Sequence, residues 1–203
     1  AAALGLDFYE YGKDFSFSNS SFKNGDLLLS HVVLGLQGAY QEENAALALQ
    51  AFLLFMKQRG WEIDFSVLPS SLRETHWAGR LEEISPGIYL DGAHNLPALT
   101  RLVEFIKEQK GKKCNLLFGA LKRKDYSGML AYLQETLPEV QVTVTSFSYG
   151  ESVGQGEAAD FEYVADYREF IESFKRNQAA DQLLFITGSL YFIAEVRAYL
   201  YRV

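Results

Sequence analysis

The amino-acid sequence predicts an α/β protein, in which a mostly parallel β-sheet with crossover helices follows a small antiparallel β-meander and one long helix. The main observation is that short apolar runs alternate with segments of helical periodicity between residues 87 and 203, which is the pattern of a parallel sheet. In addition, residues 6–34 contain short aromatic and β-branched runs broken by turn residues. A helix is predicted at residues 44–56, where nearly every side chain is apolar.

The first 74 residues are predicted to form a separate region. The Asn-Gly-Asp sequence at residues 24–26 favours a hairpin turn within the meander, and Gly60 is expected to end the long helix. Because that helix is apolar nearly all round, we expect it to be buried on most sides. Residues 61–77 show no clear period, so we place a linker there and divide the chain into domains at 1–74 and 75–203.

The second region is predicted to contain alternating strands and helices. The strands are 88–90, 115–118, 140–145 and 183–187, and the helices are 97–109, 127–135, 167–174 and 190–201. A Gly/Ser-rich loop is expected at about 146–160. Apolar residues recur every three or four positions in the first and last of these helices, so both helices are expected to pack on the sheet.

The composition limits the partners that the chain can bind. Its 203 residues carry a formal net charge of −7, so a nucleic acid or an anionic membrane would be repelled at long range. No apolar stretch approaches the ~18 residues that a membrane helix needs. The single cysteine, Cys114, lies in an apolar run, where we expect a buried reduced thiol and a cytoplasmic protein. Because the chain starts at Ala1 rather than Met, we expect a longer natural polypeptide, with processing as the alternative.

Polar side chains follow the predicted strand 88–90. In open parallel sheets, ligands bind at the carboxyl ends of the strands, where helix N-termini also point. Asp91 could accept hydrogen bonds from a ribose, and His94 could donate to a carboxylate or a phosphate. Asn95 is a natural N-cap for the helix that follows. On spacing alone, the alternative is that Asp91 caps the turn and that His94 is a surface residue.

Two further positions can bind an anion. After the predicted strand 183–187, Ser189 and free backbone N–H groups could cradle one, although on spacing alone a simple N-cap serine is the alternative. Arg80 lies where the two domains meet, and its planar guanidinium suits a phosphate. The alternative for Arg80 is an ion pair with Glu82 or Glu83.

The remaining polar residues predict no further site. The basic run 122–124 follows a predicted strand, and such a run is usually solvated surface. His31 and His76 stand alone, and no His/Cys cluster has the spacing of zinc ligands. No Gly-x-Ser-x-Gly or Cys–His grouping points to a covalent nucleophile. We therefore predict neither metal ligands nor a covalent nucleophile in this sequence.

Four segments carry recognisable motifs. Residues 38–45 read Gly-x-Tyr-Gln-x-x-Asn-Ala, 77–82 read Trp-Ala-Gly-Arg-Leu-Glu, 91–95 read Asp-Gly-Ala-His-Asn, and 186–191 read Ile-Thr-Gly-Ser-Leu-Tyr. Together they resemble the Mur ligase superfamily, and most closely its folylpolyglutamate synthase branch, which is called dihydrofolate synthase when bifunctional. The third motif is identical to the family signature. The first two differ from the usual pattern by a tyrosine in place of histidine and an alanine in place of proline.

The resemblance implies a fold and a set of residue roles. The fold is a Rossmann-like, mostly parallel C-terminal domain of the Mur ligase type, preceded by the C-terminal remnant of a central ATP-binding domain. The implied cofactor-binding residues are Asn44 for the adenine of ATP, Arg80 for its phosphates and Asp91 for its ribose. The implied catalytic residues are His94, beside the nucleotide, and Ser189, which would hold the incoming glutamate.

The reaction implied by the resemblance is ATP-dependent. ATP phosphorylates the folate carboxylate, and the glutamate amine then attacks the acyl phosphate. The implied partners are folate, glutamate and ATP with Mg²⁺, without nucleic acid or membrane, and we expect a monomer. The sequence contains no Gly-x-x-x-x-Gly-Lys-Ser/Thr loop. We therefore expect the Mg²⁺ ligands in a missing N-terminal part, and no ligase activity from this chain alone.

Two other interpretations remain open. A Mur ligase of peptidoglycan synthesis would share the motif at 91–95 but would add an amino acid to a nucleotide-sugar peptide, and the sequence at 187–191 disfavours it. The alternative from another class of protein is a non-catalytic module that binds a nucleotide or an acidic amino acid without turnover.

Overall fold

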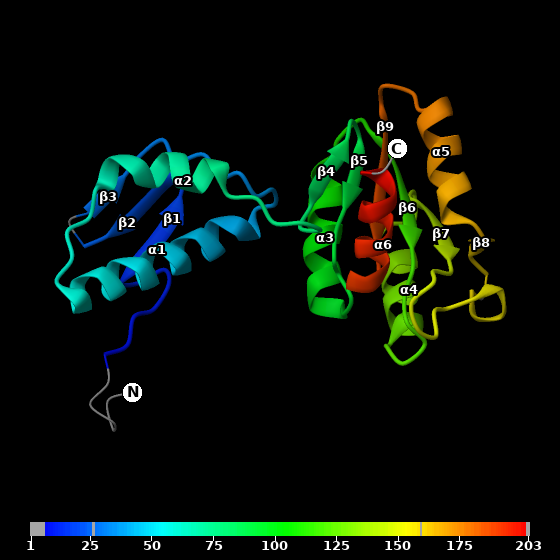
Figure 1. The fold of residues 1–203 in the computed structure, drawn as a ribbon, viewed down its shortest axis with the longest axis horizontal. Helices are drawn as coiled ribbons and strands as arrows, with labels where there is room; N and C mark the ends of the chain where they lie inside the picture. The colour runs from blue at the N-terminus through cyan, green and yellow to red at the C-terminus, as the bar shows by residue number, and fades with distance from the viewer. Residues whose placement is uncertain (1–6, 26, 159, 202–203) are drawn as a thin grey trace. The chain divides into compact units, whose positions relative to one another are not determined.

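The computed structural model describes residues 7–25, 27–158 and 160–201, and the chain divides into two compact units (Figure 1). Unit 1 is Ala1–His76 and unit 2 is Trp77–Val203. Each unit has its own hydrophobic core. This division falls close to the domain boundary that the sequence analysis placed after residue 74.

Unit 1 contains the antiparallel meander that the sequence predicts. Its three-stranded sheet has the order β1-β2-β3, with the strands Phe15–Ser18, Ser21–Asn24 and Leu27–Leu29. Asn19 and Ser20 connect the first two strands, and their φ angles are 49° and 55°, as a two-residue hairpin loop with the natural strand twist requires. The turn predicted at residues 24–26 includes Asp26, which lies outside the described residues.

The long helix α1, Tyr40–Arg59, is present, but it is less buried than the sequence predicts. Gly60 ends it in the left-handed conformation, as expected. The buried residues share one side of the helix and are Gln41, Ala45, Ala46, Leu49 and Gln50. Elsewhere on the helix, Leu47, Phe52 and Phe55 are 47%, 37% and 46% exposed. The prediction of burial on most sides is wrong, because an apolar pattern does not say how many helix faces have neighbours.

The segment predicted as a linker contains a helix. The 3₁₀-helix η2, Phe65–Val67, leads directly into α2, Leu68–Glu74. Leu68 is buried in the core of unit 1, and the carbonyl of Leu72 accepts a hydrogen bond from the Gly35 N–H at 3.0 Å. The linker prediction is therefore wrong for most of residues 61–77. Two helical turns are too short to show a convincing apolar period.

Unit 2 contains the mostly parallel sheet that the sequence predicts. Its strand order is β4-β5-β9-β6-β7-β8, and every neighbouring pair is parallel except β4 and β5. The strands are β4 Glu82–Ser85, β5 Ile88–Leu90, β6 Lys113–Phe118, β7 Gln141–Thr145, β8 Glu162–Val164 and β9 Gln182–Thr187. The helices are α3 Leu96–Glu108, α4 Tyr126–Thr136, α5 Tyr167–Asn177 and α6 Leu190–Leu200, with a 3₁₀-helix η3 at Gln155–Glu157.

The sequence analysis missed the two edge strands of this sheet, β4 and β8. They have 4 and 3 residues, and both carry glutamate rather than the apolar run that predicts a buried strand. An edge strand is paired on one side only, so it needs fewer apolar side chains than a central strand. Apolar runs in the sequence therefore predicted the four central strands of the sheet but not its two edge strands.

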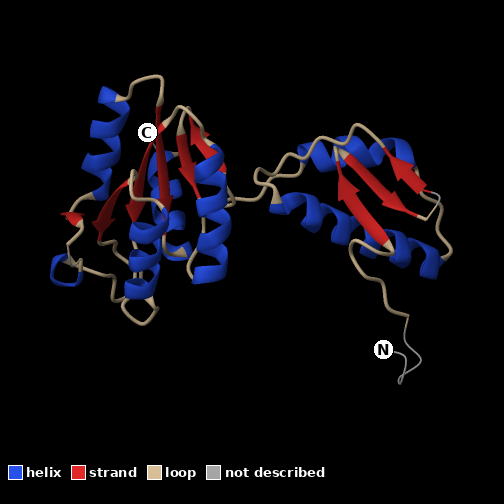
Figure 2. Ribbon diagram, turned by 180° about the vertical axis from the view of Figure 1, so that it is seen from behind, coloured by secondary structure: helices blue, strands red, loops and turns tan. Residues whose placement is uncertain are grey.

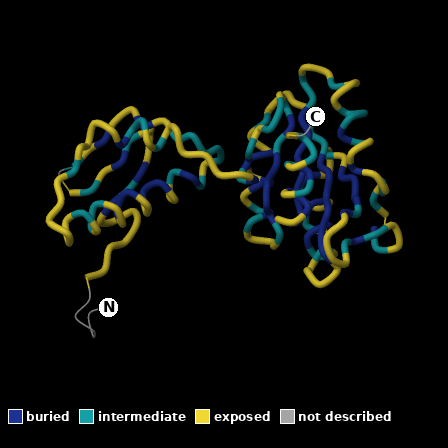
Figure 3. Tube along the Cα trace, viewed as in Figure 1, coloured by how far each residue is buried: buried dark blue, intermediate teal, exposed yellow. Residues whose placement is uncertain are grey.

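Helices cover both faces of the sheet in unit 2 (Figure 2). Leu184 and Ile186 of β9 pack in one core cluster with the inward residues of α5 and α6. Phe185, which lies between them in the strand, contacts Phe105 of α3 at a ring-centroid distance of 6.2 Å. Because side chains alternate along a strand, α3 lies on the opposite face from α5 and α6. The buried part of the trace follows these central strands (Figure 3).

Cys114 is half-buried rather than buried. It lies near the start of β6, at the rim of the sheet, whereas full burial in this strand begins at Leu116. Partial burial raises the pKa of the Cys114 thiol above its ordinary value.

No helix in the described ranges is both long enough and apolar enough to cross a membrane.

Candidate functional site

The carboxyl ends of β5, β9 and β6 lie side by side in unit 2. Leu90 is paired with Ile186, and Phe118 is paired with Thr187. The pairing continues beyond the strands, because the Asp91 N–H donates to the Ile186 carbonyl at 3.0 Å. β9 is last in the chain but lies between β5 and β6, so the strand order changes direction here. Ligands in open parallel sheets bind at such positions.

Asp91 is buried and bonded to backbone amides. The residue is 5% exposed, and its Oδ2 and Oδ1 accept hydrogen bonds from the N–H groups of Leu81 and Ala93, at 3.1 Å and 3.0 Å. Burial raises the pKa of the Asp91 carboxyl above its ordinary value, against the lowering influence of these bonds and of the charges on Arg80 and His94. The carboxylate thus fixes two turns, and its contact with a ribose stays a prediction.

The turn before β4 holds a strained residue. Leu81 has a φ of 46° and is 1% exposed, and the left-handed conformation costs about 1–2 kcal/mol for a residue with a Cβ. The hydrogen bond to Asp91 and the burial of the leucine side chain stabilise this conformation. On the other side of the turn, the Gly79 N–H donates to Glu82 Oε2 at 2.8 Å. Hydrogen bonds on both sides stabilise this strained turn, which favours a functional role for the residue between Gly79 and Leu81.

That residue is Arg80, which is half-buried. Glu82, one of the partners considered from the sequence, is bonded instead to Nε of Arg197, at 2.9 Å and 3.1 Å. The other, Glu83, accepts a hydrogen bond from the Gly87 N–H at 2.9 Å. Within the described part of the chain, the guanidinium of Arg80 has no hydrogen-bond or ion-pair partner. The structural alternative for Arg80 is therefore wrong, and its guanidinium is available to an anion.

His94 is oriented by the turn that Asp91 fixes. Its Nδ1 lies 2.8 Å from the carbonyl oxygen of Gly92. Because a carbonyl can only accept, Nδ1 carries a proton, and Nε2 accepts from the neutral ring or donates from the protonated ring. The residue is half-buried rather than on the open surface. Asn95 is the N-cap of α3, as predicted, and its Oδ1 accepts from the Ala98 N–H at 3.0 Å.

Ser189 is the N-cap of α6. Its Oγ accepts a hydrogen bond from the Tyr191 N–H at 3.3 Å. The preceding residue, Gly188, has a φ of 112°, and a Cβ there would lie 2.7 Å from the Gly119 carbonyl oxygen. The Gly188 N–H donates to the Ala93 carbonyl at 3.0 Å. The N-cap alternative is thus observed, and Ser189 is also joined to the turn of Asp91; its contact with glutamate stays a prediction.

The structure gathers four of the five predicted site residues at one edge of unit 2, namely Arg80, Asp91, His94 and Ser189. The fifth, Asn44, belongs to unit 1, where it is exposed on α1. Its Nδ2 donates to Oε1 of the buried Gln41 at 2.9 Å, which orients the amide. The contact of Asn44 with an adenine stays a prediction.

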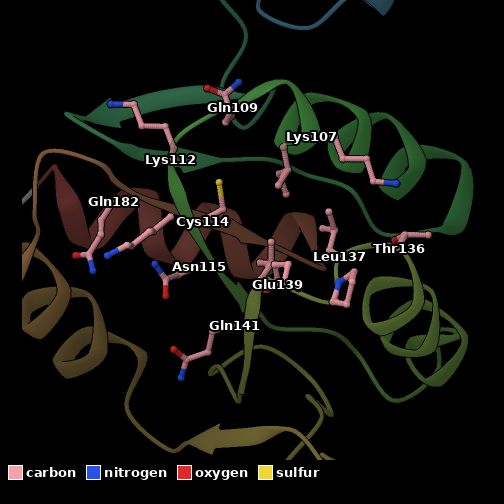
Figure 4. Close-up of a pocket in the computed structure, with 14 residues that line it drawn as sticks. Lys107, Gln109, Lys112, Cys114, Asn115, Thr136, Leu137, Glu139, Gln141 and Gln182 are labelled. Atoms are coloured by element: carbon pink, nitrogen blue, oxygen red, sulfur yellow. The ribbon is translucent and has the colours of Figure 1, made fainter.

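A cavity lies at the opposite, amino-terminal edge of the same sheet, and none of the five predicted site residues lines it (Figure 4). Its volume is about 670 Å³, and its lining includes Cys114, Gln141 and Gln182 from the first residues of β6, β7 and β9. Across the described ranges, no group of three or more His, Cys, Asp or Glu residues could hold a metal ion.

Known proteins share both the sequence motifs and the fold. The family model described as Mur ligase, glutamate ligase domain, matches residues 79–190. The dihydrofolate synthase/folylpolyglutamate synthase of Bacillus subtilis is 30% identical over 186 residues, which are 87% of this chain and 43% of that protein. A solved FPGS–AMPPCP–folate complex has a TM-score of 0.78 at 27% identity, over 98% of this chain and 48% of that one.

A second solved structure shows the same fold. It is a bifunctional folylpolyglutamate synthase/dihydrofolate synthase from Yersinia pestis, complexed with AMPPNP and a Mn ion. Its TM-score is 0.80 at 21% identity, over 98% of this chain and 49% of that one. A likeness at this identity concerns the fold alone.

The matched segment contains Arg80, the signature at residues 91–95 and Ser189, so unit 2 is a glutamate ligase domain of the Mur ligase class. Within that class, the chain belongs to the folylpolyglutamate synthase/dihydrofolate synthase family. It spans about half the length of the relatives and solved structures that it matches. The family and the fold class predicted from the sequence are confirmed.

Proposed function

We propose that this chain forms the part of an ATP-dependent ligase that contacts the nucleotide and delivers the amino acid. In the complete enzyme, L-glutamate is added to the γ-carboxyl of a folate through an acyl phosphate. Dihydrofolate synthesis is a possible additional activity of the same enzyme. The observation that carries the proposal is the guanidinium of Arg80, which has no bonding partner among the described residues and lies at the same carboxyl edge of a glutamate ligase domain as His94 and Ser189.

The arrangement at this edge suits a phosphoryl group. In the described ranges, no carboxylate is hydrogen-bonded to the guanidinium of Arg80, and planar N–H donors of this kind stabilise charge on a transferring phosphoryl group. The Nδ1–H of His94 donates to the Gly92 carbonyl, so the protonated ring can donate from Nε2 to an anionic oxygen. Both groups are set by turns that Asp91 bonds, and fixed donors require little reorganisation during the reaction.

The remaining predicted roles are part of the same proposal. Asn44 contacts the adenine, Asp91 accepts from the ribose through its remaining lone pairs, and Ser189 holds the incoming glutamate. The N-terminus of α6 supports the last role, because unpaired amides at a helix start favour a carboxylate. The described residues do not fit a Mg²⁺ site, so no step of the reaction is assigned to a metal held by them.

We also propose that this chain alone does not catalyse ligation, because its sequence lacks a phosphate-binding Gly-x-x-x-x-Gly-Lys-Ser/Thr loop. The complex of a similar protein with AMPPCP and folate supports the nucleotide and the folate of the main proposal. Inactivity of the chain alone predicts no glutamate-dependent ADP release from the 203 residues. ADP release from this chain that requires both glutamate and folate would contradict this part of the proposal.

The test of the main proposal uses the protein encoded by the whole reading frame in which this sequence lies. Transfer of labelled L-glutamate to tetrahydrofolate is expected to require ATP. Replacing Arg80→Gln is expected to lower kcat about a hundredfold or more, the usual effect of losing one charged donor at a reacting group. The matched control is Arg101→Gln, because Arg101 is paired with Glu104 on the exposed side of α3.

Two outcomes of the same assay would favour the alternative functions. Transfer of an amino acid to a nucleotide-sugar peptide, and not to folate, would favour a Mur ligase of peptidoglycan synthesis. Binding of a nucleotide without turnover of any acceptor would favour a non-catalytic module. The curated relatives, which carry the names of folylpolyglutamate and dihydrofolate synthases, support the folate acceptor.

A further inference from the structure

A groove crosses the amino-terminal edge of the sheet in unit 2, and none of the five predicted site residues lines it (Figure 4). Its larger part is the cavity of about 670 Å³ between the ends of α3 and α4 and the first residues of β6, β7 and β9. A second cavity of about 380 Å³ shares the lining residues Gln109, Lys112 and Gln182 with it. The two cavities therefore adjoin, and we call them together the amino-edge groove. Two adjoining cavities suit a chain-like ligand better than a compact one.

The larger cavity is locally positive, although the formal net charge of the chain is −7. Its charged lining residues in the described ranges are three lysines and one acid, namely Lys107, Lys112, Lys113 and Glu139. Lys107 forms no hydrogen bond or ion pair with any described residue, and the Nζ of Lys112 donates to a backbone carbonyl at 3.1 Å. The Nζ of Lys113 lies 3.9 Å from a carboxylate oxygen of Asp181, which is the limit of an ion pair. We therefore expect an anionic ligand.

The helix ends at this edge limit the kind of anion. Phosphate sites commonly use free N–H groups at a helix N-terminus, whereas α3 and α4 both end here, at Glu108 and Thr136. The last turn of a helix presents carbonyl oxygens with partial negative charge, which oppose a compact and highly charged phosphate. In the second cavity, the carboxylate of Glu83 adds to that opposition. Single carboxylates spaced along a chain, each beside a lysine of the larger cavity, fit these surroundings better.

The amino-edge groove also offers hydrogen bonds to uncharged parts of a ligand. Four amide side chains line its larger cavity, namely Gln109, Asn115, Gln141 and Gln182 (Figure 4). The amide nitrogens of Gln109 and Asn115 donate to backbone carbonyls at 3.1 Å and 3.3 Å, which leaves their oxygens as acceptors. Oε1 of Gln182 accepts from a backbone N–H at 3.1 Å, which leaves its amide nitrogen as a donor. Peptide groups, which have one donor and one acceptor each, complement such a surface.

We propose that the amino-edge groove binds a chain of γ-linked glutamates, with the lysines on its carboxylates and the amide side chains on its peptide groups. Such a chain alternates one carboxylate with one peptide group, so it presents both kinds of group that the groove complements. The assignment rests on the proposed function, in which glutamate is added to the γ-carboxyl of a folate, and it concerns the product rather than the incoming amino acid.

A chain bound in the amino-edge groove leaves the candidate site open. The strands β6 and β9 have 6 residues each, so the amino-terminal and carboxyl edges of the sheet are separated by about 20 Å. The groove is therefore a second site for the product and not a part of the reaction site.

The test is an NMR titration of the 203-residue chain with γ-linked triglutamate. It is expected to shift the backbone amides of Lys107, Asn115 and Gln141. L-Glutamate is expected to shift these amides with about tenfold or more weaker affinity, because it makes fewer ionic contacts. Tripolyphosphate, a compact anion, and α-linked triglutamate, which has the same charge, are also expected to bind more weakly. Preference over the α-linked isomer separates a product of the proposed reaction from an acidic peptide segment.

Three variants assign the contacts. Lys107→Gln and Lys112→Gln are each expected to weaken the binding of γ-linked triglutamate about threefold, the usual effect of a solvent-exposed ion pair. Lys110→Gln is the matched control, because it removes the same charge from the same segment but Lys110 lines neither cavity. It is expected to change the affinity by less than about twofold, since salt screens an exposed charge that makes no direct contact. Each folded state is verified by its NMR spectrum before titration.

The proposal is overturned if γ-linked triglutamate shifts none of these amides, or if tripolyphosphate or the α-linked isomer binds as tightly. It is also overturned if Lys110→Gln weakens binding as much as Lys107→Gln, because the lysines then act only as a general positive surface. Glutamate transfer by the full-length protein tests the proposed function separately. Transfer without triglutamate binding removes only the groove assignment, whereas binding without transfer leaves the groove as a glutamate-chain site and removes the proposed function.

Discussion

The two units of this chain differ in how fully they bury their large apolar side chains. In unit 2, six strands with helices on both faces bury the apolar residues of the sheet. Most of the large apolar side chains that unit 2 leaves exposed lie at the candidate site, namely Leu96, Tyr149, Leu190 and Tyr191. In unit 1, exposed apolar side chains are spread over the sheet, α1 and the segments beyond it, including Leu28, Val33, Leu47, Phe55 and Trp61.

The difference follows from the number of layers. A sheet of three short strands with α1 packed on it encloses one small core, and several large apolar side chains of unit 1 stay exposed outside that core. Exposed apolar surface beyond scattered single residues marks a region that contacts something else. We therefore infer that unit 2 is a self-contained domain with a ligand edge, whereas unit 1 is part of a larger core, as its proposed place in a central ATP-binding domain requires.

The largest expected effect comes from separating the units. Trp77–Val203 expressed alone is expected to unfold cooperatively in urea, because its core is complete. Ala1–His76 expressed alone is expected to show no cooperative transition, because a small unit with uncovered apolar surface buries too little to offset the conformational entropy of folding. Far-UV circular dichroism during urea titration measures both. A cooperative transition of the separated unit 1 would break the comparison.

A large but local effect is expected in the core of unit 2. Phe185 is fully buried between two sheet neighbours and stacks on Tyr89 at 5.2 Å. Phe185→Ala is expected to lower the free energy of unfolding by about 3–5 kcal/mol. The matched control is Phe8→Ala, because the side chain of Phe8 is 69% exposed before β1, and this change is expected to alter the free energy of unfolding by about 0.5 kcal/mol or less. Urea denaturation of the full chain measures both, and equal effects would contradict the assigned layers.

The sequence predicted unit 2 better than unit 1 for the same physical reason. Apolar periodicity reports how many sides of an element are covered, and in unit 2 each central strand and helix has the neighbours that its pattern implies. The pattern of α1 implied neighbours that the described residues do not supply. The two turns of α2 carried too few apolar residues to show a period, so a helix in the core was taken for a linker.

The position of the candidate residues was predicted in part, and their roles stay predictions. Asp91, His94 and Ser189 became candidates because they follow strands, and the ends of strands can be recognised in a sequence. Long-range pairings are not visible, so the bond of Asp91 to Leu81 and the pairing of Glu82 with Arg197 were missed. The strained turn at Leu81 follows from the first of these bonds.

A moderate effect is expected from removing the carboxylate that holds this turn. Asp91→Ala leaves the buried N–H groups of Leu81 and Ala93 without their acceptor. An unsatisfied buried amide costs about 1–3 kcal/mol. Because the substitution also removes the cost of burying the carboxylate charge, we expect the free energy of unfolding of unit 2 to fall by about 2 kcal/mol in total. Chemical denaturation at pH 7 measures it. A neutral effect would show that the turn does not depend on Asp91.

A smaller effect is expected from pH. The pH dependence of stability that Asp91 contributes in unit 2 should have the opposite sign from the one that Asp64 contributes in unit 1. The native pKa of Asp91 is raised by burial, so the native state holds its proton more tightly than the unfolded state does. The stability of wild type relative to Asp91→Ala should therefore fall as pH rises from about 4 through the native pKa. Hydrogen bonds from Ser66 lower the pKa of Asp64 in unit 1, so wild type relative to Asp64→Ala should gain stability as pH rises through the lowered native pKa to about 4, and should change little above that. Denaturation series from about pH 2.5 to 7 check both slopes, and a gain for Asp91 above pH 4 would contradict the burial assigned to Asp91.

The smallest expected effect on stability concerns the uncovered face of α1. Leu47 is 47% exposed and is not part of the core of unit 1, so Leu47→Gln is expected to change the free energy of unfolding by about 0.5 kcal/mol or less. Leu49→Gln, two positions away but buried, is the control and should be strongly destabilising. If Leu47→Gln instead costs as much as Leu49→Gln, this face is covered in solution, and the contrast between a complete unit 2 and an incomplete unit 1 does not hold.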